Sequence, residues 1–183
     1  GIFAGDFTRD GNEQSWDFFD KQVSKLKFGI HLVPGNHDIG YDINNVQAKR
    51  YKNRYGNFYK SFKFKNDLFI ILNPYEDKWS IKNQQYFFLK TILEQNYDLV
   101  DNIFIITHPV FYINDQFQVI PNSLGGAKNA DKFSPDFDPV YEKIETVNKK
   151  FEFAKKNINF WSEIYPLFEK YINKYYIISG DVG

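Results

Sequence analysis

The segment Gly35-Asn36-His37-Asp38 carries an amide, an imidazole and a carboxylate on three consecutive residues. Amide and carboxylate oxygens and imidazole nitrogens all bind metal ions, and histidine also exchanges protons near neutral pH. The segment follows an apolar run and Pro34, so it is expected in a turn at the end of a strand. It therefore predicts a metal or acid–base site. Either Asp38 or a backbone carbonyl could orient the His37 ring.

Three further polar residues, Asp6, His108 and Asp181, each follow an apolar run closely. The carboxyl ends of parallel strands meet at one edge of a sheet, where ligands bind. We therefore expect these side chains to converge with Asn36 and His37. A carboxylate such as Asp6 is the natural group to bridge two ions, and the amide of Asn36 can ligate without adding charge.

The chain contains no cysteine and only three histidines, so thiolate metal sites and disulfides are excluded. Oxygen and imidazole ligands without thiolate suit Mn, Fe or Zn. Two such ions about 3.5–4 Å apart can clamp a phosphoryl group and activate water. The predicted cofactor is therefore a pair of divalent metal ions.

The elements that must position these residues can be read from hydrophobic patterning. Continuous apolar runs predict buried strands, and helical spacing predicts amphipathic helices between them. Together they predict an α/β fold with a parallel or mixed sheet. The predicted strands are residues 2–4, 30–33, 68–72, 103–106 and 176–178; the predicted helices are residues 16–26, 81–92 with Ser80 as N-cap, 140–151 from near Pro139, and about 162–174.

Two other segments have distinct patterns. Residues 58–64 partly alternate and predict an antiparallel hairpin with residues 68–72, turning at Asn66-Asp67. Residues 112–138 are rich in Asn, Asp, Gly, Ser and Pro and predict a long loop near the site.

Charge and hydropathy give no specific signal for nucleic acid or a membrane as partner. Lys and Arg total 23 and Asp and Glu total 23, so the formal net charge is zero and favours neither nucleic acid nor an anionic membrane. No apolar run approaches the roughly 18–20 residues of a membrane helix. The sequence assigns no compartment.

Three motifs resemble those of the calcineurin-like metallophosphoesterases: Gly5-Asp6-Phe7-Thr8, Gly35-Asn36-His37-Asp38 and Thr107-His108-Pro109. The resemblance covers most of the chain, except for about residues 112–160, which we interpret as an insertion. It implies one domain over residues 1–183, built as a two-sheet sandwich flanked by helices. It also implies hydrolysis of a phosphorylated substrate.

The resemblance implies a role for each matching residue. Asp6 would bridge two metal ions, and Asn36 and His108 would bind one of them. Asn36 and His37 would contact the phosphate. His37 would protonate the leaving alkoxide, with Asp38 orienting its ring.

Two departures from the family pattern matter. The upstream Asp-x-His motif is absent, which predicts a domain incomplete at its N terminus. The chain reads Gly180-Asp181-Val182-Gly183 where the family reads Gly-His-x-His, so Asp181 could replace the first of those histidines and Gly183 offers no ligand. The alternative interpretation is a catalytically degenerate member that serves as a binding or structural module. A serine or thiol hydrolase has little support, because the chain lacks both Cys and a Gly-x-Ser-x-Gly turn.

Overall fold

Two β-sheets form the centre of the molecule in the computed structural model, which describes residues 1–112, 158–171 and 174–181. One sheet has two parallel strands and the other has four, in the order β3-β4-β5-β6. Only the β3–β4 pair of the larger sheet is antiparallel, so the predicted hairpin and mixed α/β class are confirmed. The strands are β1 (Ile2–Ala4), β2 (His31–Val33), β3 (Lys60–Phe64), β4 (Asp67–Ile71), β5 (Asn102–Thr107) and β6 (Lys174–Ser179).

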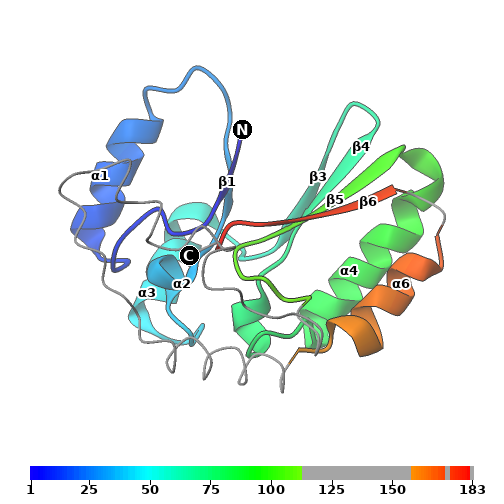
Figure 1. Cartoon of the computed structure of the whole chain (residues 1–183). Helices are drawn as coiled ribbons and strands as arrows, with labels where there is room; N and C mark the ends of the chain where they lie inside the picture. The colour runs from blue at the N-terminus through cyan, green and yellow to red at the C-terminus, as the bar shows by residue number, and fades with distance from the viewer. Residues whose placement is uncertain (113–157, 172–173, 182–183) are drawn as a thin grey trace, which may run out of the picture.

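Helices lie on the outer sides of the two sheets (Figure 1). α1 (Glu13–Val23), α2 (Asn36–Ile39) and α3 (Val46–Tyr55) accompany the two-stranded sheet, whereas α4 (Asn83–Asn96) and α6 (Tyr165–Glu169) accompany the four-stranded sheet. Short helical turns complete the described part of the chain. These are η1 (Pro74–Asp77), η2 (Tyr97–Leu99) and the π-helix η4 (Phe160–Ile164).

Three apolar clusters hold these layers together. The first packs α4 and α6 against the four-stranded sheet, and the second packs α1, α2 and α3 against β2. The third lies between the sheets, where Val33 of β2 meets Ile71 of β4 and Ile106 of β5. Burial of these side chains is the main favourable contribution to folding.

Several predicted boundaries are wrong, for local reasons. Ser80 is not the N-cap of α4, which is Lys82, because the buried Asn159 amide binds both the N–H and the carbonyl of Ile81 and keeps that residue out of the helix. The final helix does not reach Lys174, where β6 begins. The hairpin turns at Lys65 and Asn66 instead of Asn66-Asp67, with Lys65 at φ 54°.

The remaining differences from the predicted elements concern β6, helices α2 and α3, and the segments after residue 111. β6 is not buried on both faces, since its residues alternate between exposed and half-buried. Helices α2 and α3 were not predicted. The predicted loop at residues 112–138 lies outside the described residues except for Tyr112, and the predicted helix at residues 140–151 lies wholly outside them.

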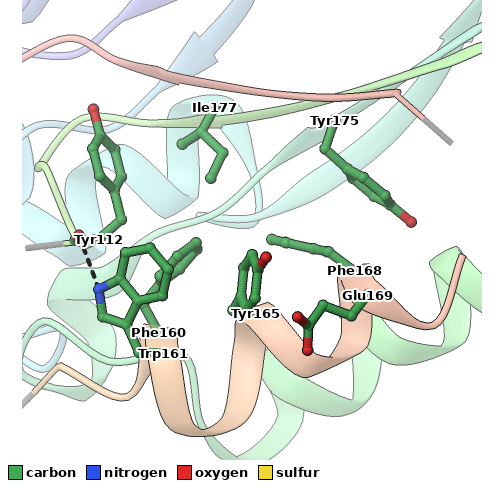
Figure 2. Close-up of a pocket in the computed structure, with 8 residues that line it drawn as sticks. All are labelled: Tyr112, Phe160, Trp161, Tyr165, Phe168, Glu169, Tyr175 and Ile177. Carbon is green, nitrogen blue, oxygen red and sulfur yellow. Dashed lines mark hydrogen bonds between the residues drawn. The ribbon is translucent and has the colours of Figure 1, made fainter. Parts of the chain in front are cut away.

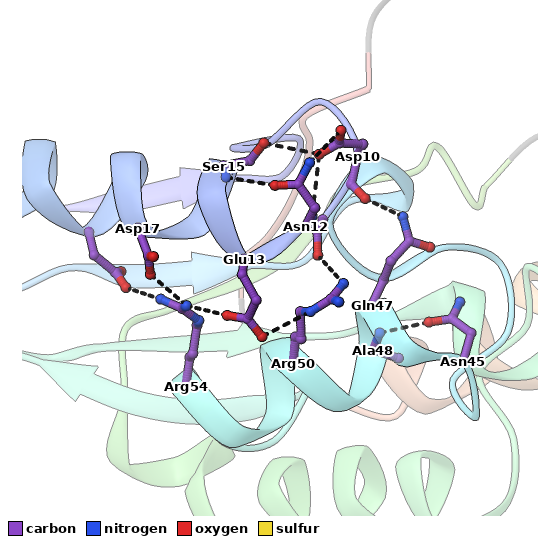
Figure 3. Close-up of polar contacts among 12 residues, drawn as sticks. Asp10, Asn12, Glu13, Ser15, Asp17, Asn45, Gln47, Ala48, Arg50 and Arg54 are labelled. Carbon is purple, nitrogen blue, oxygen red and sulfur yellow. Dashed lines mark hydrogen bonds and ion pairs between the residues drawn. The ribbon is translucent and has the colours of Figure 1, made fainter.

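A charged brace joins α1 to α3 and ties down the loop that follows β1 (Figure 3). The Arg54 guanidinium lies 2.7 Å from Asp17 and 2.6 Å from Asp20. Arg50 contacts Glu13 at 2.9 Å and donates to the Gly11 carbonyl at 3.2 Å. The loop that carries Asp6 is thereby held to α3, which begins only a few residues after α2.

The helical segment of residues 160–169 packs beneath β6, where the Phe168 and Tyr175 rings stack with their centroids 4.8 Å apart (Figure 2). In the part of the chain that the structure describes, no helix combines the length and apolar character needed to cross a membrane.

Candidate functional site

Three glycines let the strand ends approach one another closely. A Cβ at Gly5 would lie 2.1 Å from His108 Nδ1, and one at Gly35 would lie 2.1 Å from Asp6 Oδ1. A Cβ at Gly180 would lie 1.8 Å from the Ala4 carbonyl oxygen. The ends of β1, β2, β5 and β6 therefore meet at one place, as the parallel-strand argument predicts.

At these strand ends, two ionisable groups, Asp6 and His108, lie in contact. His108 Nδ1 lies 2.7 Å from the Ala4 carbonyl oxygen, and since that oxygen can only accept, Nδ1 carries a hydrogen. His108 Nε2 lies 3.2 Å from Asp6 Oδ2, but it is buried and makes no well-aligned hydrogen bond within the described structure. If His108 were neutral, the lone pair of its Nε2 would face a lone pair of Asp6 Oδ2. That arrangement is favourable only if a proton or a cation lies between the two atoms.

Electrostatics at this pair follow from the same contact. Burial alone would lower the pKa of His108, but the Asp6 carboxylate and the Ala4 carbonyl outweigh it and raise the pKa. Burial alone would raise the pKa of Asp6, but His108 and the His37 backbone N–H, which donates to Asp6 Oδ1 at 3.1 Å, lower it. Asp6 is thus held ionised, which suits a cation-binding carboxylate.

His37 is exposed and lies on α2, beside Asp6. Its Nδ1 lies 2.7 Å from the Arg9 carbonyl oxygen, so Nδ1 carries a hydrogen. The ring is therefore oriented by a backbone carbonyl, one of the two possibilities that the sequence left open. Among the described residues, no hydrogen bond engages its Nε2.

Asp38 is fully buried, and its contacts are not those implied by the family resemblance. Its Oδ1 accepts from the backbone N–H and the hydroxyl of Thr8, both at 3.0 Å, and its Oδ2 accepts from the Gly35 N–H at 2.9 Å. The expectation that Asp38 orients His37 is thus corrected. Asp38 instead fastens the loop after β1 to the turn after β2. Burial raises its pKa to about 6 against these hydrogen bonds.

Asn36 lies between Gly35 and His37, and its Oδ1 accepts a hydrogen bond of 3.1 Å from the Tyr75 hydroxyl. An amide oxygen has two lone pairs, so this contact leaves one for a second partner. The Tyr75 ring lies 6.3 Å from the His108 ring, centroid to centroid. Burial and the charges of Asp181 and Asp6 raise the pKa of Tyr75, so it is a constant hydrogen-bond donor here.

Asp181 contributes to the site by a backbone hydrogen bond and by the effect of its charge on neighbouring groups. Its N–H donates to the His108 carbonyl at 2.8 Å, and its charge contributes to the raised pKa values of His108 and Tyr75. Among residues 1–112, 158–171 and 174–181, no group of three or more His, Cys, Asp or Glu side chains is arranged to hold a metal ion. Among these described residues, Asp6 and His108 form an ionisable pair in contact, and the neutral amide of Asn36 belongs to the same edge of the structure.

Sequence reasoning missed Thr8 and Tyr75. Thr8 is buried, accepts from the Gly11 N–H and donates to Asp38. It stands inside the quoted Gly5-Asp6-Phe7-Thr8 motif, which could have drawn attention to it. Tyr75 belongs to a 3₁₀ turn after β4, and no pattern in its neighbourhood points to Asn36, which is 39 residues away.

Substitution of Gly5 by alanine tests the close approach of strand ends. Gly5 has φ +91°, and the added Cβ would overlap the His108 ring. We expect a loss of at least about 2 kcal/mol in the free energy of unfolding, measured by urea titration. Gly29→Ala is the matched control, because nothing lies within 4 Å of the position that its Cβ would take. Equal unfolding midpoints for the two variants would show that the backbone at Gly5 does not lie against the His108 ring.

Two comparisons with known proteins bear on this site. The chain matches no protein-family model, and a search of curated proteins finds no match to it either. The chemistry of the site therefore has to be judged from the residues themselves and their geometry.

Proposed function

We propose that this chain is a metal-dependent phosphoester hydrolase domain of the calcineurin-like type. Its two sheets and outer helices would correspond to that family's two-sheet sandwich. The observation that carries the proposal is the contact between His108 Nε2 and Asp6 Oδ2, 3.2 Å apart, with Nδ1 already committed to the Ala4 carbonyl.

The donor types at this place would suit a divalent metal, although only two ionisable side chains of the described residues are in contact here. Among the described residues, the buried His108 Nε2 makes no well-aligned hydrogen bond and faces the ionised Asp6 carboxylate, so a cation between them would satisfy both. Asp6 and His108, joined by Asn36 and Asp181, are oxygen and imidazole groups that suit Mn, Fe or Zn. Two ions are proposed, and Asp6 would help to hold both. When bound, such ions lower the pKa of water and neutralise charge on a phosphoryl group.

The other residues would bind the phosphorylated substrate and move a proton. The side-chain amide of Asn36 accepts a hydrogen bond from Tyr75 through its oxygen. Its NH₂ group would donate to a phosphoryl oxygen. His37, held by the Arg9 carbonyl, would give the proton on Nε2 to the leaving oxygen. Asp38 would act only as a positioning residue, through Thr8 and Gly35.

Turnover of p-nitrophenyl phosphate by the purified chain, with and without added Mn, tests this proposal. We expect release of p-nitrophenol that requires the metal and stops when a chelator is added. No turnover with Mn, Fe or Zn, together with no metal binding, would overturn it.

The second candidate is a binding module on the same fold without turnover. It is favoured by the limited set of ionisable ligands that the described residues bring into contact, Asp6 and His108. The same assay separates the two candidates, because a binding module would bind the metal, weakly or at one site, and release no product.

The His108→Gln variant tests the metal site separately from turnover. Loss of the imidazole nitrogen should weaken Mn binding by at least about tenfold, since even changes outside the ligand set commonly cost 10–100-fold. Isothermal titration calorimetry measures this directly. His31→Gln is the matched control, because His31 stacks on Phe62 in the sheet and lies outside the site. Unchanged affinity in His108→Gln would exclude His108 as a ligand.

A further inference from the structure

A second candidate binding site lies away from these strand ends, beneath β6. A cavity of about 340 Å³ opens between β6 and the helical segment of residues 160–169. Its volume falls in the range of small-molecule sites. Figure 2 shows Trp161, Tyr165 and Phe168 rising from the helical segment toward Tyr175 and Ile177 of β6. None of the cavity's lining residues belongs to the candidate metal site.

The lining is aromatic, with rings set at different angles. The Phe160 and Trp161 rings are perpendicular, with centroids 5.0 Å apart, and Trp161 meets Tyr165 at 5.2 Å and 48°. Such an arrangement presents ring faces as well as ring edges to the cavity. Ring faces carry negative electrostatic potential and attract cations, most strongly on tryptophan.

The cavity also carries one charge, that of Glu169, which has no ion pair among the described residues. Glu169 is the only charged side chain among the described residues that line it. Its neighbour Lys170, by contrast, lies 3.8 Å from Glu94. Figure 2 shows the Glu169 carboxylate on the Tyr165 side of the cavity. The lining therefore combines several aromatic faces with a single negative charge.

The backbone that carries Phe160 and Trp161 has an uncommon conformation. Residues 160–164 form a π-helix, a rare turn that is found frequently at functional sites. The Trp161 Nε1–H donates to the Tyr112 carbonyl at 3.2 Å, which fixes the plane of the indole. Trp161 is nevertheless 46% exposed and Tyr165 is 39% exposed. Two large rings are thus held in place by the backbone and left accessible.

We propose that this cavity binds a small molecule bearing a quaternary ammonium group, with the cation against Trp161 and Tyr165 and Glu169 balancing its charge. A quaternary ammonium is apolar on its surface and cannot donate hydrogen bonds, which matches a lining with few polar atoms. An ordinary ammonium would find one carboxylate, that of Glu169, for its several N–H groups, and the others would face mostly aromatic rings. This proposal is independent of the phosphoester chemistry.

Calorimetric titration of the 183-residue chain with choline, at constant ionic strength, tests the proposal. The matched ligand is 3,3-dimethylbutan-1-ol, which has the same shape without the charge. We expect choline to bind about 5–30-fold more tightly than this alcohol, the ratio that cation–π attraction supplies. Equal affinity for the two ligands, or no binding of choline, would overturn the proposal.

Two variants locate the binding. Trp161→Leu should weaken choline binding by about fivefold or more, and Glu169→Gln by about twofold or more. Glu94→Gln makes the same change on the neighbouring helix α4, outside the cavity, and should leave the affinity unchanged. Because Trp161 is half exposed, its replacement should leave the chain folded, which the urea midpoint checks. Wild-type affinity in Trp161→Leu would refute the assignment.

Discussion

Replacing His37 by alanine should lower kcat for phenyl phosphate by about 10²–10⁴-fold, the usual contribution of a general acid. The Arg9 carbonyl fixes the hydrogen on Nδ1, so the ring can present a second proton on Nε2 to the leaving oxygen. Phenolate is a poor leaving group, since phenols of the tyrosine kind have a pKa of about 10, and it needs that proton. Steady-state kinetics with saturating Mn measures the effect.

The same variant should lose much less activity on p-nitrophenyl phosphate, because p-nitrophenolate leaves readily without protonation. This difference between the two substrates distinguishes an acid from a residue that only supports the site. His31→Ala provides the control, because its ring stacks on Phe62 and contacts no site residue named above. Equal losses on both substrates would remove the acid role from His37.

The second large effect is expected on stability, at Asp38. In Asp38→Ala the Thr8 and Gly35 N–H groups would be left buried without an acceptor. Each such loss costs about 1–3 kcal/mol, so the free energy of unfolding should fall by about 3 kcal/mol or more. Urea unfolding of the metal-free chain gives the value.

Asp38→Asn refines this test. The amide keeps one acceptor oxygen but turns an NH₂ group toward a hydrogen-bond donor, so we expect a smaller loss, of about 1–3 kcal/mol. The exposed Asp98→Asn makes the same chemical change on η2 and should leave the midpoint nearly unchanged. If Asp38→Ala unfolded at the wild-type midpoint, Asp38 would not be the link between the two loops.

Much of the fold follows from local pattern. Continuous apolar runs at β1, β2, β4, β5 and β6 predicted strands because such runs suit a sheet covered by other layers. Boundaries failed where a distant side chain intervened, as Asn159 does at Ile81. Helix α3 was missed because few of its residues form the buried face, among them Ala48 and Tyr51.

The candidate site shows the same division. The order of strands and polar turns was enough to expect Asp6, Asn36, His37 and His108 at one edge, and contacts in the structure join Asp6 to His37 and His108. The partner of each group was beyond local pattern. Tyr75 meets Asn36, and Thr8 meets Asp38, across 39 and 30 residues of chain.

By itself the sequence determined which residue types end each strand, because strand-forming runs and turns are local properties of the chain. The Gly35-Asn36-His37-Asp38 segment belongs to this class. Only the tertiary structure decided that the Arg9 carbonyl orients His37, that Asp38 is a buried link, and that aromatic rings gather beneath β6. These contacts depend on how separate elements pack, and packing specifies distances that no spacing along the chain contains.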